Sequence, residues 1–296
     1  MSTEPGLSVV IASVNGMPYL GKCLDALAER CREAEIVVAD WTDDATRKAV
    51  RERWPSVKLL SFDEPMAIPE LRAAGVLAAT ARVVALIEDH CLVAPAWGDR
   101  LAAGHAAGHN VVGGPIRNVA TERIRDWAAF FCEYSAVMEP LPQGPAKALP
   151  GMNVSYDRRA LEAIDDLLRD GRWENWLHPR LVERGFELWC EPGAVVGHDK
   201  DFDLREFLSQ RYHYSRSFAG MRNPELGARR FLYALGTPLL VPLLYWRTAR
   251  NVFGRRRQRR QFLLATPLVL LYLSVWAFGE AVGYLVGGGR SLLKVR

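Results

Sequence analysis

The chain has 296 residues, of which 49% are hydrophobic and 24% are charged, a composition that excludes a disordered protein and suits one large domain with an appendage. Sixteen basic and three acidic residues lie from Arg205 onward, so the formal net charge of +4 divides into +13 for this tail and −9 for the first 204 residues. Because the basic residues bracket long apolar runs, the tail predicts an anionic membrane surface as its partner and speaks against a nucleic acid.

The first ninety residues alternate strand-like and helix-like segments. Apolar runs that alternate with helices indicate an α/β fold with a mostly parallel sheet covered on both faces. Ligands of such sheets bind beyond the carboxyl ends of the strands, where this sequence places the polar clusters Ser13–Asn15, Asp40–Asp44 and Glu88–His90. The predicted strands and helices are, in chain order, Leu7–Ala12, Tyr19–Arg30, Glu35–Ala39, Thr46–Arg53, Val57–Ser61, Pro69–Ala79 and Val83–Ile87.

The pattern becomes less regular after Trp97. The proline-rich stretch Pro140–Pro150 predicts a loop, and Gly185 is placed to end a helix. The predicted elements of this part are a strand at Val111–Gly113, helices at Asp126–Tyr134, Arg158–Asp170 and Asn175–Gly185, and short strands at Phe186–Cys190 and Ala194–Gly197.

The tail contains two apolar runs with an arginine-rich connector between them. The second run, Phe262–Val286, is long enough to span a bilayer, whereas Phe231–Trp246 is short and contains Pro238 and Pro242. If both runs spanned, the arginines of Arg247–Gln261 would lie outside, against the positive-inside tendency. We therefore expect the first run to be re-entrant or interfacial; burial of both runs in a soluble protein is the alternative. The predicted division is a body at 1–204, a basic juxtamembrane segment at 205–230 and membrane-associated helices at 231–296, with the connector at 247–261.

The location of the body follows from its first residues and its cysteines. No cationic leader with an apolar core opens the sequence, and the five cysteines are scattered without a Cys-x-x-Cys pair. We expect a cytosolic body on a membrane-associated protein, at the inner membrane of a bacterium.

Glu88-Asp89-His90, after the strand Val83–Ile87, is the first candidate for chemistry. Carboxylates at the carboxyl edge of a sheet can hold a divalent cation, which neutralises a diphosphate. Acidic residues after a strand are more often part of a solvated loop. Three polar clusters at one predicted edge favour the site.

Several segments together resemble the family 2 glycosyltransferases of GT-A fold, over roughly the first 200 residues. The segments that carry the resemblance are Ser8–Asn15, Glu35–Asp40, Arg72, and Glu88-Asp89-His90 with Pro95 and Trp97. The resemblance implies a Rossmann-like nucleotide-diphospho-sugar transferase fold, a nucleotide-sugar donor, a divalent cation and direct displacement with inversion at the sugar carbon.

The same resemblance assigns donor-side roles. Asn15 would lie near the donor pocket, Asp40 would contact the base, Arg72 would lie beside the nucleotide, and Glu88 and Asp89 would belong to the segment that replaces the family's Asp-x-Asp. Arg211, in a segment that partly resembles an element of processive synthases, would contact the diphosphate.

This sequence departs from the family pattern at three positions. His90 takes the position of the second aspartate, Ala12 stands where the family usually has proline, and Ala39 stands where it often has an aspartate. Histidine ligates Mn²⁺ but suits Mg²⁺ poorly, so the identity and the necessity of the cation stay open. The predicted ligands are His90, Asp89 and His198, the last of which resembles a histidine that closes the metal site.

Inverting transfer needs a general base for the acceptor hydroxyl, and the family carries a carboxylate before a helix that ends in glycine. Glu174 occupies this position, with Trp173 and Trp176 placed to stack on a sugar; the alternative is that Glu174 only stabilises the start of a helix. Asn153, in a segment similar to the family's acceptor-side turn, is the remaining acceptor-binding candidate.

Three hypotheses follow from these assignments. The first is an inverting hexosyltransferase of polysaccharide biosynthesis that moves a sugar from a UDP-linked donor to a lipid-linked or cell-surface glycan precursor. In the second, the acceptor is polyprenyl phosphate itself. The third is a catalytically inactive membrane scaffold that retains the fold.

Overall fold

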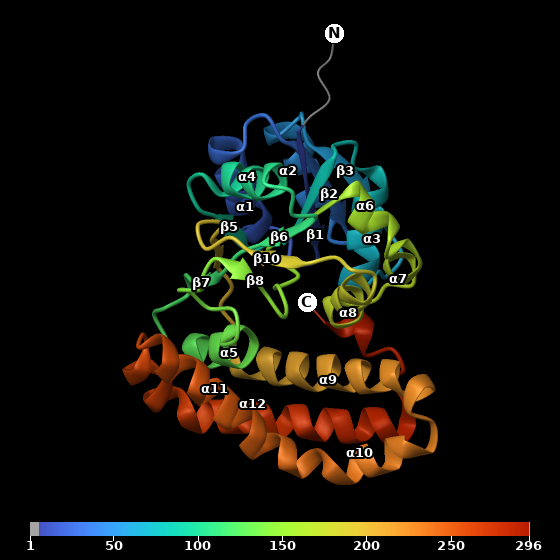
Figure 1. The fold of residues 1–296 in the computed structure, drawn as a ribbon, viewed down its shortest axis with the longest axis vertical. Helices are drawn as coiled ribbons and strands as arrows, with labels where there is room; N and C mark the ends of the chain where they lie inside the picture. Colours follow the sequence, from blue (N-terminus) through green and yellow to red (C-terminus); the bar gives the residue numbers. More distant parts are fainter. Residues whose placement is uncertain (1–5, 296) are drawn as a thin grey trace. The chain divides into compact units, whose positions relative to one another are not determined.

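The computed structural model describes residues 6–295 and divides the chain into two compact units (Figure 1). The first unit, called the catalytic unit below, comprises the described residues up to Val119 together with Val137–Asp199. The second, called the helical unit, comprises Ala120–Ala136 and residues 200–295. The chain therefore passes between the units three times.

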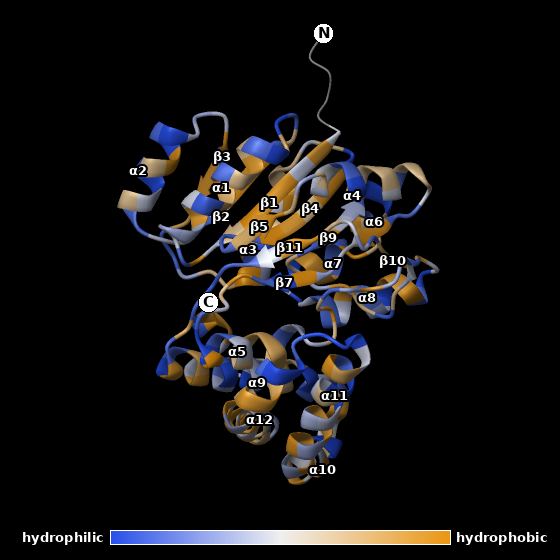
Figure 2. Cartoon of the chain, turned by 90° about the vertical axis from the view of Figure 1, so that its left-hand side faces the viewer, coloured by the Kyte–Doolittle hydropathy of each residue, from blue (hydrophilic) through white to orange (hydrophobic). Residues whose placement is uncertain are grey.

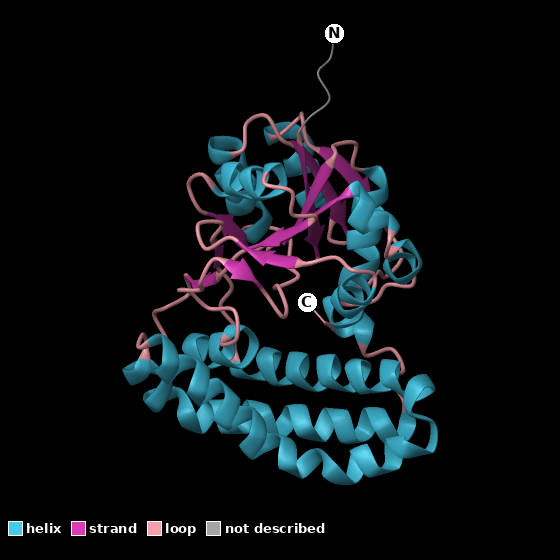
Figure 3. Ribbon diagram, in the orientation of Figure 1, coloured by secondary structure: helices cyan, strands magenta, loops and turns pink. Residues whose placement is uncertain are grey.

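An eight-stranded sheet forms the centre of the catalytic unit, with the strand order β3-β2-β1-β4-β9-β6-β10-β8 (Figure 3). The pairs β1–β2, β1–β4, β2–β3 and β6–β10 are parallel, whereas β9 runs antiparallel to both β4 and β6. This arrangement confirms the predicted α/β class with a mostly parallel sheet. The strands are β1 Leu7–Ser13, β2 Glu35–Asp40, β3 Lys58–Ser61, β4 Val83–Glu88, β6 Val111–Gly113, β8 Gly144–Pro145, β9 Val154–Asp157 and β10 Leu188–Cys190.

Helices cover both faces of this sheet (Figures 1 and 2). The helix predicted over Arg158–Asp170 is interrupted around Ile164, where two short helices meet. The helices of this unit are α1 Tyr19–Arg30, α2 Asp44–Arg53, α3 Ile68–Ala78, α4 Trp97–Ala106, α6 Arg158–Glu162, α7 Asp165–Arg169 and α8 Glu174–Glu183.

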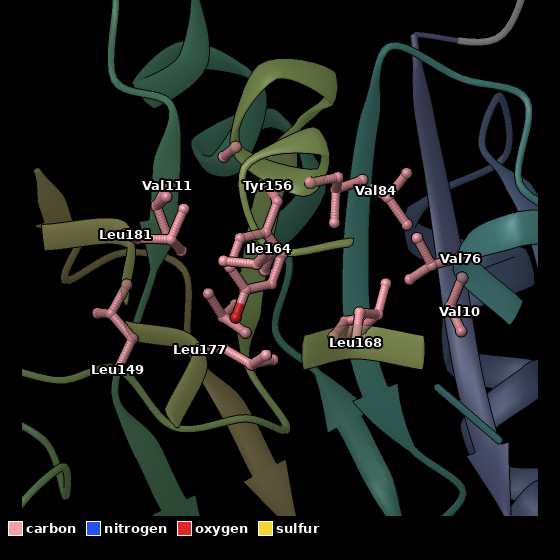
Figure 4. Close-up of a cluster of buried hydrophobic side chains, with 14 of the residues drawn as sticks. Val10, Val76, Val84, Val111, Leu149, Tyr156, Ile164, Leu168, Leu177 and Leu181 are labelled. Carbon is pink, nitrogen blue, oxygen red and sulfur yellow. The ribbon is translucent and has the colours of Figure 1, made fainter. Parts of the chain in front are cut away.

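The hydrophobic core between the sheet and α3, α6, α7 and α8 consists of buried aliphatic residues together with Tyr156 and Cys190 (Figure 4). Val10 of β1 and Val76 of α3 belong to it. Helix α3 lies close to β1 because Gly75 faces Val10, and a methyl group on Gly75 would overlap the Val10 side chain. This close packing fixes the helix that carries Arg72.

The register of the parallel strands brings the ends of β1, β2 and β4 to one edge. Ser13 pairs with Asp40, and Ala12 pairs with Glu88. A second, three-stranded sheet of order β5-β11-β7 adds to this region, and within it His198 pairs with Cys91. Its strands are β5 Cys91–Val93, β7 Ile116–Asn118 and β11 Val196–His198.

The helical unit contains one helix that is long and apolar enough to cross a membrane, α12. The segment expected to be a basic juxtamembrane stretch is largely the helix α9, and α11 continues through the first arginines of the expected connector to Arg255. The helices are α5 Ile124–Tyr134, α9 Leu204–Leu226, α10 Arg230–Gly236, α11 Leu240–Arg255 and α12 Arg259–Val286, with 3₁₀ turns at Gly227–Arg229, Thr237–Leu239 and Leu292–Lys294.

Candidate active site

Asp89 joins the loops that follow β1 and β4. One of its carboxylate oxygens accepts hydrogen bonds from the backbone N–H groups of Val14 and Asn15, at 2.9 and 2.6 Å, and the other accepts from the Asn15 side chain at 2.7 Å. Burial alone would raise the pKa of Asp89, but hydrogen bonds from His90 and Asn15 outweigh it and hold the pKa below its usual value. Asp89 is thus an ionised, fully buried carboxylate that shapes the loop.

Asp40 has a similar position at the end of β2. It is fully buried and accepts hydrogen bonds from the Thr42 hydroxyl at 2.8 Å and from Arg47 Nε at 3.1 Å. Arg47 also bonds Asp63, at 2.7 Å. Asp40, the carboxylate predicted to contact the nucleotide base, therefore has partners in the loop after β2 and on helix α2. The partner on α2, Arg47, was not singled out from the sequence.

Arg72 of α3 joins two carboxylates from distant parts of the chain. One terminal nitrogen bonds Glu88 at 2.5 Å, and the other bonds Glu174. The guanidinium side chain is 5% exposed, and the two carboxylates are 14% and 15% exposed. Three of the predicted site residues thus form one buried ionic cluster at the carboxyl edge of the sheet.

Glu174 is the first residue of α8, where the helix dipole stabilises a negative charge. Its carboxylate lies directly against Gly151, so that a methyl group added at Gly151 would overlap the carboxylate. Trp173 is buried, with the Arg72 guanidinium 5.6 Å from its ring centroid, whereas Trp176 is half-buried. The Gly151 turn and Arg72 together hold Glu174 in place.

His90 and His198 meet beside Glu88. Their ring centroids are 4.7 Å apart in an edge-on arrangement, and His90 Nε2 lies 3.6 Å from a Glu88 oxygen. His90 Nδ1 lies 3.3 Å from an Asp89 carboxylate oxygen, and His90 Nε2 is a buried atom without a hydrogen bond. A second partner that orients a histidine in this way is typical of metal sites.

The donor chemistry of these residues fits Mn²⁺, although among residues 6–295 no group of three His, Cys, Asp or Glu side chains is arranged to hold a metal ion. His90, His198 and Glu88 supply two imidazoles and a carboxylate. Both oxygens of Asp89 accept hydrogen bonds from backbone or side-chain donors, and its predicted role as a ligand stays a prediction. Its contact with His90 also orients that ring.

Asn153 is hydrogen-bonded to protein groups, and its predicted acceptor-binding role stays a prediction. It is fully buried, its amide nitrogen donates to the carbonyls of Pro115 and Ala194, and its oxygen accepts from Trp97 Nε1 at 2.9 Å. All of these partners are protein groups, so the hydrogen bonds of Asn153 connect the segments around Trp97, Pro115 and Ala194.

Arg211 lies on α9 in the helical unit. It is buried, forms an ion pair with Glu133 of α5 and lies over the ring of Trp276 at 5.1 Å. These contacts give Arg211 a structural role within its own unit, and its predicted diphosphate contact stays a prediction.

One buried pair near Glu174 was not found from the sequence. The hydroxyl of Tyr156 and Nε2 of His178 are 2.9 Å apart, and burial lowers the pKa of His178 to about 4. His178 is therefore neutral at pH 7 and accepts the tyrosine proton. A lone histidine on a helix with no recognisable spacing gave no signal of this contact.

The family model of glycosyl transferase family 2 matches residues 8–164, more than half of the chain. The chain belongs to this family and is a glycosyltransferase, which confirms the predicted family and activity class. Among curated proteins, no match was found.

Solved structures share the fold at low sequence identity. A mannosyltransferase from Pyrobaculum calidifontis, solved with GDP-Man and Mn²⁺, is 17% identical with a TM-score of 0.57, over 94% of this chain and 88% of that one. GalNAc-T7 with UDP, GalNAc and Mn²⁺ is 14% identical with a TM-score of 0.53, over 69% of this chain and 45% of that one. S. aureus TarS 1–349 is 12% identical with a TM-score of 0.50, over 93% and 89%. These neighbours are glycosyltransferases of GT-A fold and support that fold here.

Proposed function

We propose that the chain is an inverting glycosyltransferase that moves a hexose from a UDP-linked donor to a lipid-linked or cell-surface glycan precursor. The observation that carries this proposal is the sharing of Arg72 by Glu88 and Glu174. It connects a carboxylate beside the two histidines with a second carboxylate placed to act as a base. The neighbours solved with nucleotides or nucleotide sugars support the donor class.

In this mechanism Glu174 takes the proton of the acceptor hydroxyl as that oxygen attacks the sugar carbon. The new carbon–oxygen bond forms while the bond from the sugar carbon to the diphosphate oxygen breaks, and the nucleoside diphosphate leaves with the bonding electrons. The configuration at the sugar carbon is inverted. Arg72 holds the Glu174 carboxylate in place through their ion pair.

A divalent cation would be held by His90 and His198 with Glu88, and when bound it neutralises charge on the diphosphate. The imidazoles favour Mn²⁺ over Mg²⁺. Asp89 would orient His90. Glu88 would then exchange all or part of its pairing with Arg72 for the cation.

The acceptor class is proposed from the basic and apolar tail. A polyprenyl diphosphate-linked sugar lies at a membrane surface, and so does polyprenyl phosphate, which is the second candidate acceptor. Extraction of the lipid product and its mass distinguish the two, because the second reaction yields a lipid with one phosphate and one sugar.

The test is Glu174→Gln, compared with Glu183→Gln on the same helix, whose side chain is 73% exposed. Transfer of radiolabel from UDP- and GDP-hexoses to a membrane lipid extract is measured with Mn²⁺, beside calorimetric titration with UDP and GDP. We expect Glu174→Gln to lower the transfer rate by about 10²- to 10⁴-fold with nucleotide binding kept, and Glu183→Gln to change neither. Transfer by Glu174→Gln within a few-fold of the unaltered protein would contradict the assignment of the base.

A further inference from the structure

The helical unit carries most of the large apolar side chains that are exposed among the described residues. Of twenty large apolar side chains that are exposed among the described residues, fifteen lie between residues 231 and 286. A soluble monomer rarely exposes so many together, and such a concentration marks a surface that binds a partner or a membrane. We call it the apolar surface; its most exposed members are Leu232, Leu235, Leu239, Trp246, Leu263, Leu264, Phe278, Leu285 and Val286.

On α12 the apolar surface runs the full length of the helix. Leu264, Leu271, Phe278 and Leu285 are all exposed and lie seven residues apart, so they share one face. The opposite face is buried against the rest of the helical unit through Phe262, Tyr272, Gly283 and Tyr284, among others. Helix α12 is therefore half covered by protein and half open.

The helix that covers the second half of α12 is polar. Phe207 of α9 contacts Tyr272, Arg211 lies over Trp276, and Arg222 bonds the Tyr284 hydroxyl at 2.7 Å, so α9 runs parallel to α12. A methyl group on Gly283 would overlap the Arg216 carbonyl, which shows how closely the backbones approach. If α12 crossed a bilayer, α9 would have to enter it with its arginines, each of which is costly in hydrocarbon.

The other neighbour of α12 carries positive charge at both of its ends. Tyr233 contacts Tyr284, and the Tyr245 hydroxyl lies 3.2 Å from that of Thr266, so α10 and α11 run antiparallel to α12. One end of this helical hairpin carries Arg229 and Arg230, and the other carries the exposed residues Arg256, Arg257, Arg259 and Arg260. A spanning hairpin would place arginines on both sides of the bilayer, against the positive-inside tendency.

Arginines also lie directly beside the apolar surface. Arg230 lies over Phe231 at 5.0 Å, Arg250 over Trp246 at 4.9 Å and Arg259 over Phe253 at 5.5 Å, each measured to the ring centroid. Exposed aromatic and apolar residues with arginines at their border match the boundary between lipid chains and anionic headgroups. Figure 2 shows hydrophobic and hydrophilic residues interleaved along α10 and α11.

We propose that the helical unit lies in the plane of a membrane leaflet, with the apolar surface buried among the lipids and the arginines on anionic headgroups, and that α12 does not cross the bilayer. All arginine clusters then meet the same membrane surface, and α9 stays out of the hydrocarbon. This placement also resolves the conflict of orientation that the sequence raises.

The depth of α12 in a bilayer tests this proposal. Spin labels are attached at Leu264→Cys, Leu271→Cys, Phe278→Cys and Leu285→Cys in a full-length protein with Cys31 and Cys132, the thiols that are not fully buried, replaced by serine. Accessibility to oxygen and to a water-soluble nickel complex is measured in phosphatidylcholine–phosphatidylglycerol vesicles. We expect four similar, shallow depths. A profile that is deepest at Leu271 and shallow at both ends indicates a spanning helix, and four labels outside the lipid indicate a soluble core helix or a self-association surface; either result overturns the proposal.

The affinity for vesicles provides an independent measurement. Leu264→Glu with Leu271→Glu should weaken binding by about tenfold or more, because both charges would enter the apolar layer. Leu77→Glu, at a site on α3 that is 53% exposed, is the matched control and should change nothing. Vesicles of phosphatidylcholine alone should bind about tenfold more weakly than those with phosphatidylglycerol. Equal binding by the double variant and the control would overturn the proposal.

Discussion

Arg72 is shared by two carboxylates that come from the end of β4 and the start of α8. Removing one partner of a buried ion pair lowers the free energy of unfolding by more than the intact pair contributes to it, because an uncompensated charge stays behind. In this site two carboxylates would be left facing each other.

We expect Arg72→Met to lower the free energy of unfolding by about 3 to 5 kcal/mol at neutral pH. Arg72→Lys should lower the free energy of unfolding less, since lysine keeps the positive charge but cannot bind the two carboxylates with a planar guanidinium. Denaturant titration of the two variants measures these losses, and equal unfolding free energies of Arg72→Met and the unaltered protein would show that the ion pairs of Arg72 do not stabilise the fold.

Gly151 is the residue whose size fixes the position of Glu174. We expect Gly151→Ala to displace the Glu174 carboxylate and lower sugar transfer by about tenfold or more, while nucleotide binding stays within a few-fold. Gly236→Ala is the control, since no atom lies within 4 Å of a methyl group added there. Equal transfer by the two variants would mean that Glu174 is not held by the turn.

Among the elements, β9 and α8 are joined by the buried contact of Tyr156 with His178. The pKa of His178 falls from 6.5 to about 4 on folding, so the unfolded chain binds a proton more readily. The stability that depends on a neutral His178 is therefore complete above pH 6.5, and the free energy of unfolding decreases as the pH falls toward 4.

Replacing His178 with glutamine, which accepts the tyrosine proton but does not titrate, should flatten the pH dependence of stability. We expect the decrease in unfolding free energy between pH 6.5 and pH 4 to be smaller in His178→Gln by about 2 kcal/mol. Denaturant midpoints across this range measure the slope. An unchanged slope would assign the acid sensitivity to other groups.

The elements also show what the sequence could predict. Apolar runs and their alternation with helices predicted β1, β2 and β4 closely, and the parallel register then brought Asn15, Asp40 and Glu88 to one edge. The sequence could not predict which polar side chains are already hydrogen-bonded within the protein, because most partners of Asp89 and all partners of Asn153 lie far away in the chain. The strands β5 and β7 are three residues long, too short for a periodic signal.

At the scale of the whole molecule, the helical unit is discontinuous in sequence, since it includes Ala120–Ala136 as well as the C-terminal part. Helix α5 contributes Phe131, which is fully buried and contacts Phe262 of α12. A division at residue 204 separates α5 from these partners.

A chain ending at residue 204 should therefore expose the aromatic face of α5 and aggregate. A matched variant that also replaces residues 120–136 with a short glycine-serine linker should stay soluble, because the Ile116 N–H donates to the Val137 carbonyl and the two cut ends lie close together. Light scattering and binding of a hydrophobic dye compare the two. Equal solubility would show that α5 needs no partner from the C-terminal part.

The discontinuity of the helical unit also has a consequence in time. About 125 residues separate the end of α5 at Tyr134 from the start of α12 at Arg259, and a ribosome adds about 5 to 20 residues each second. For several seconds or more, the nascent chain carries an apolar helix whose covering helices have not been made. We therefore expect the yield of folded enzyme to depend on the timing of synthesis as well as on the stability of the finished fold.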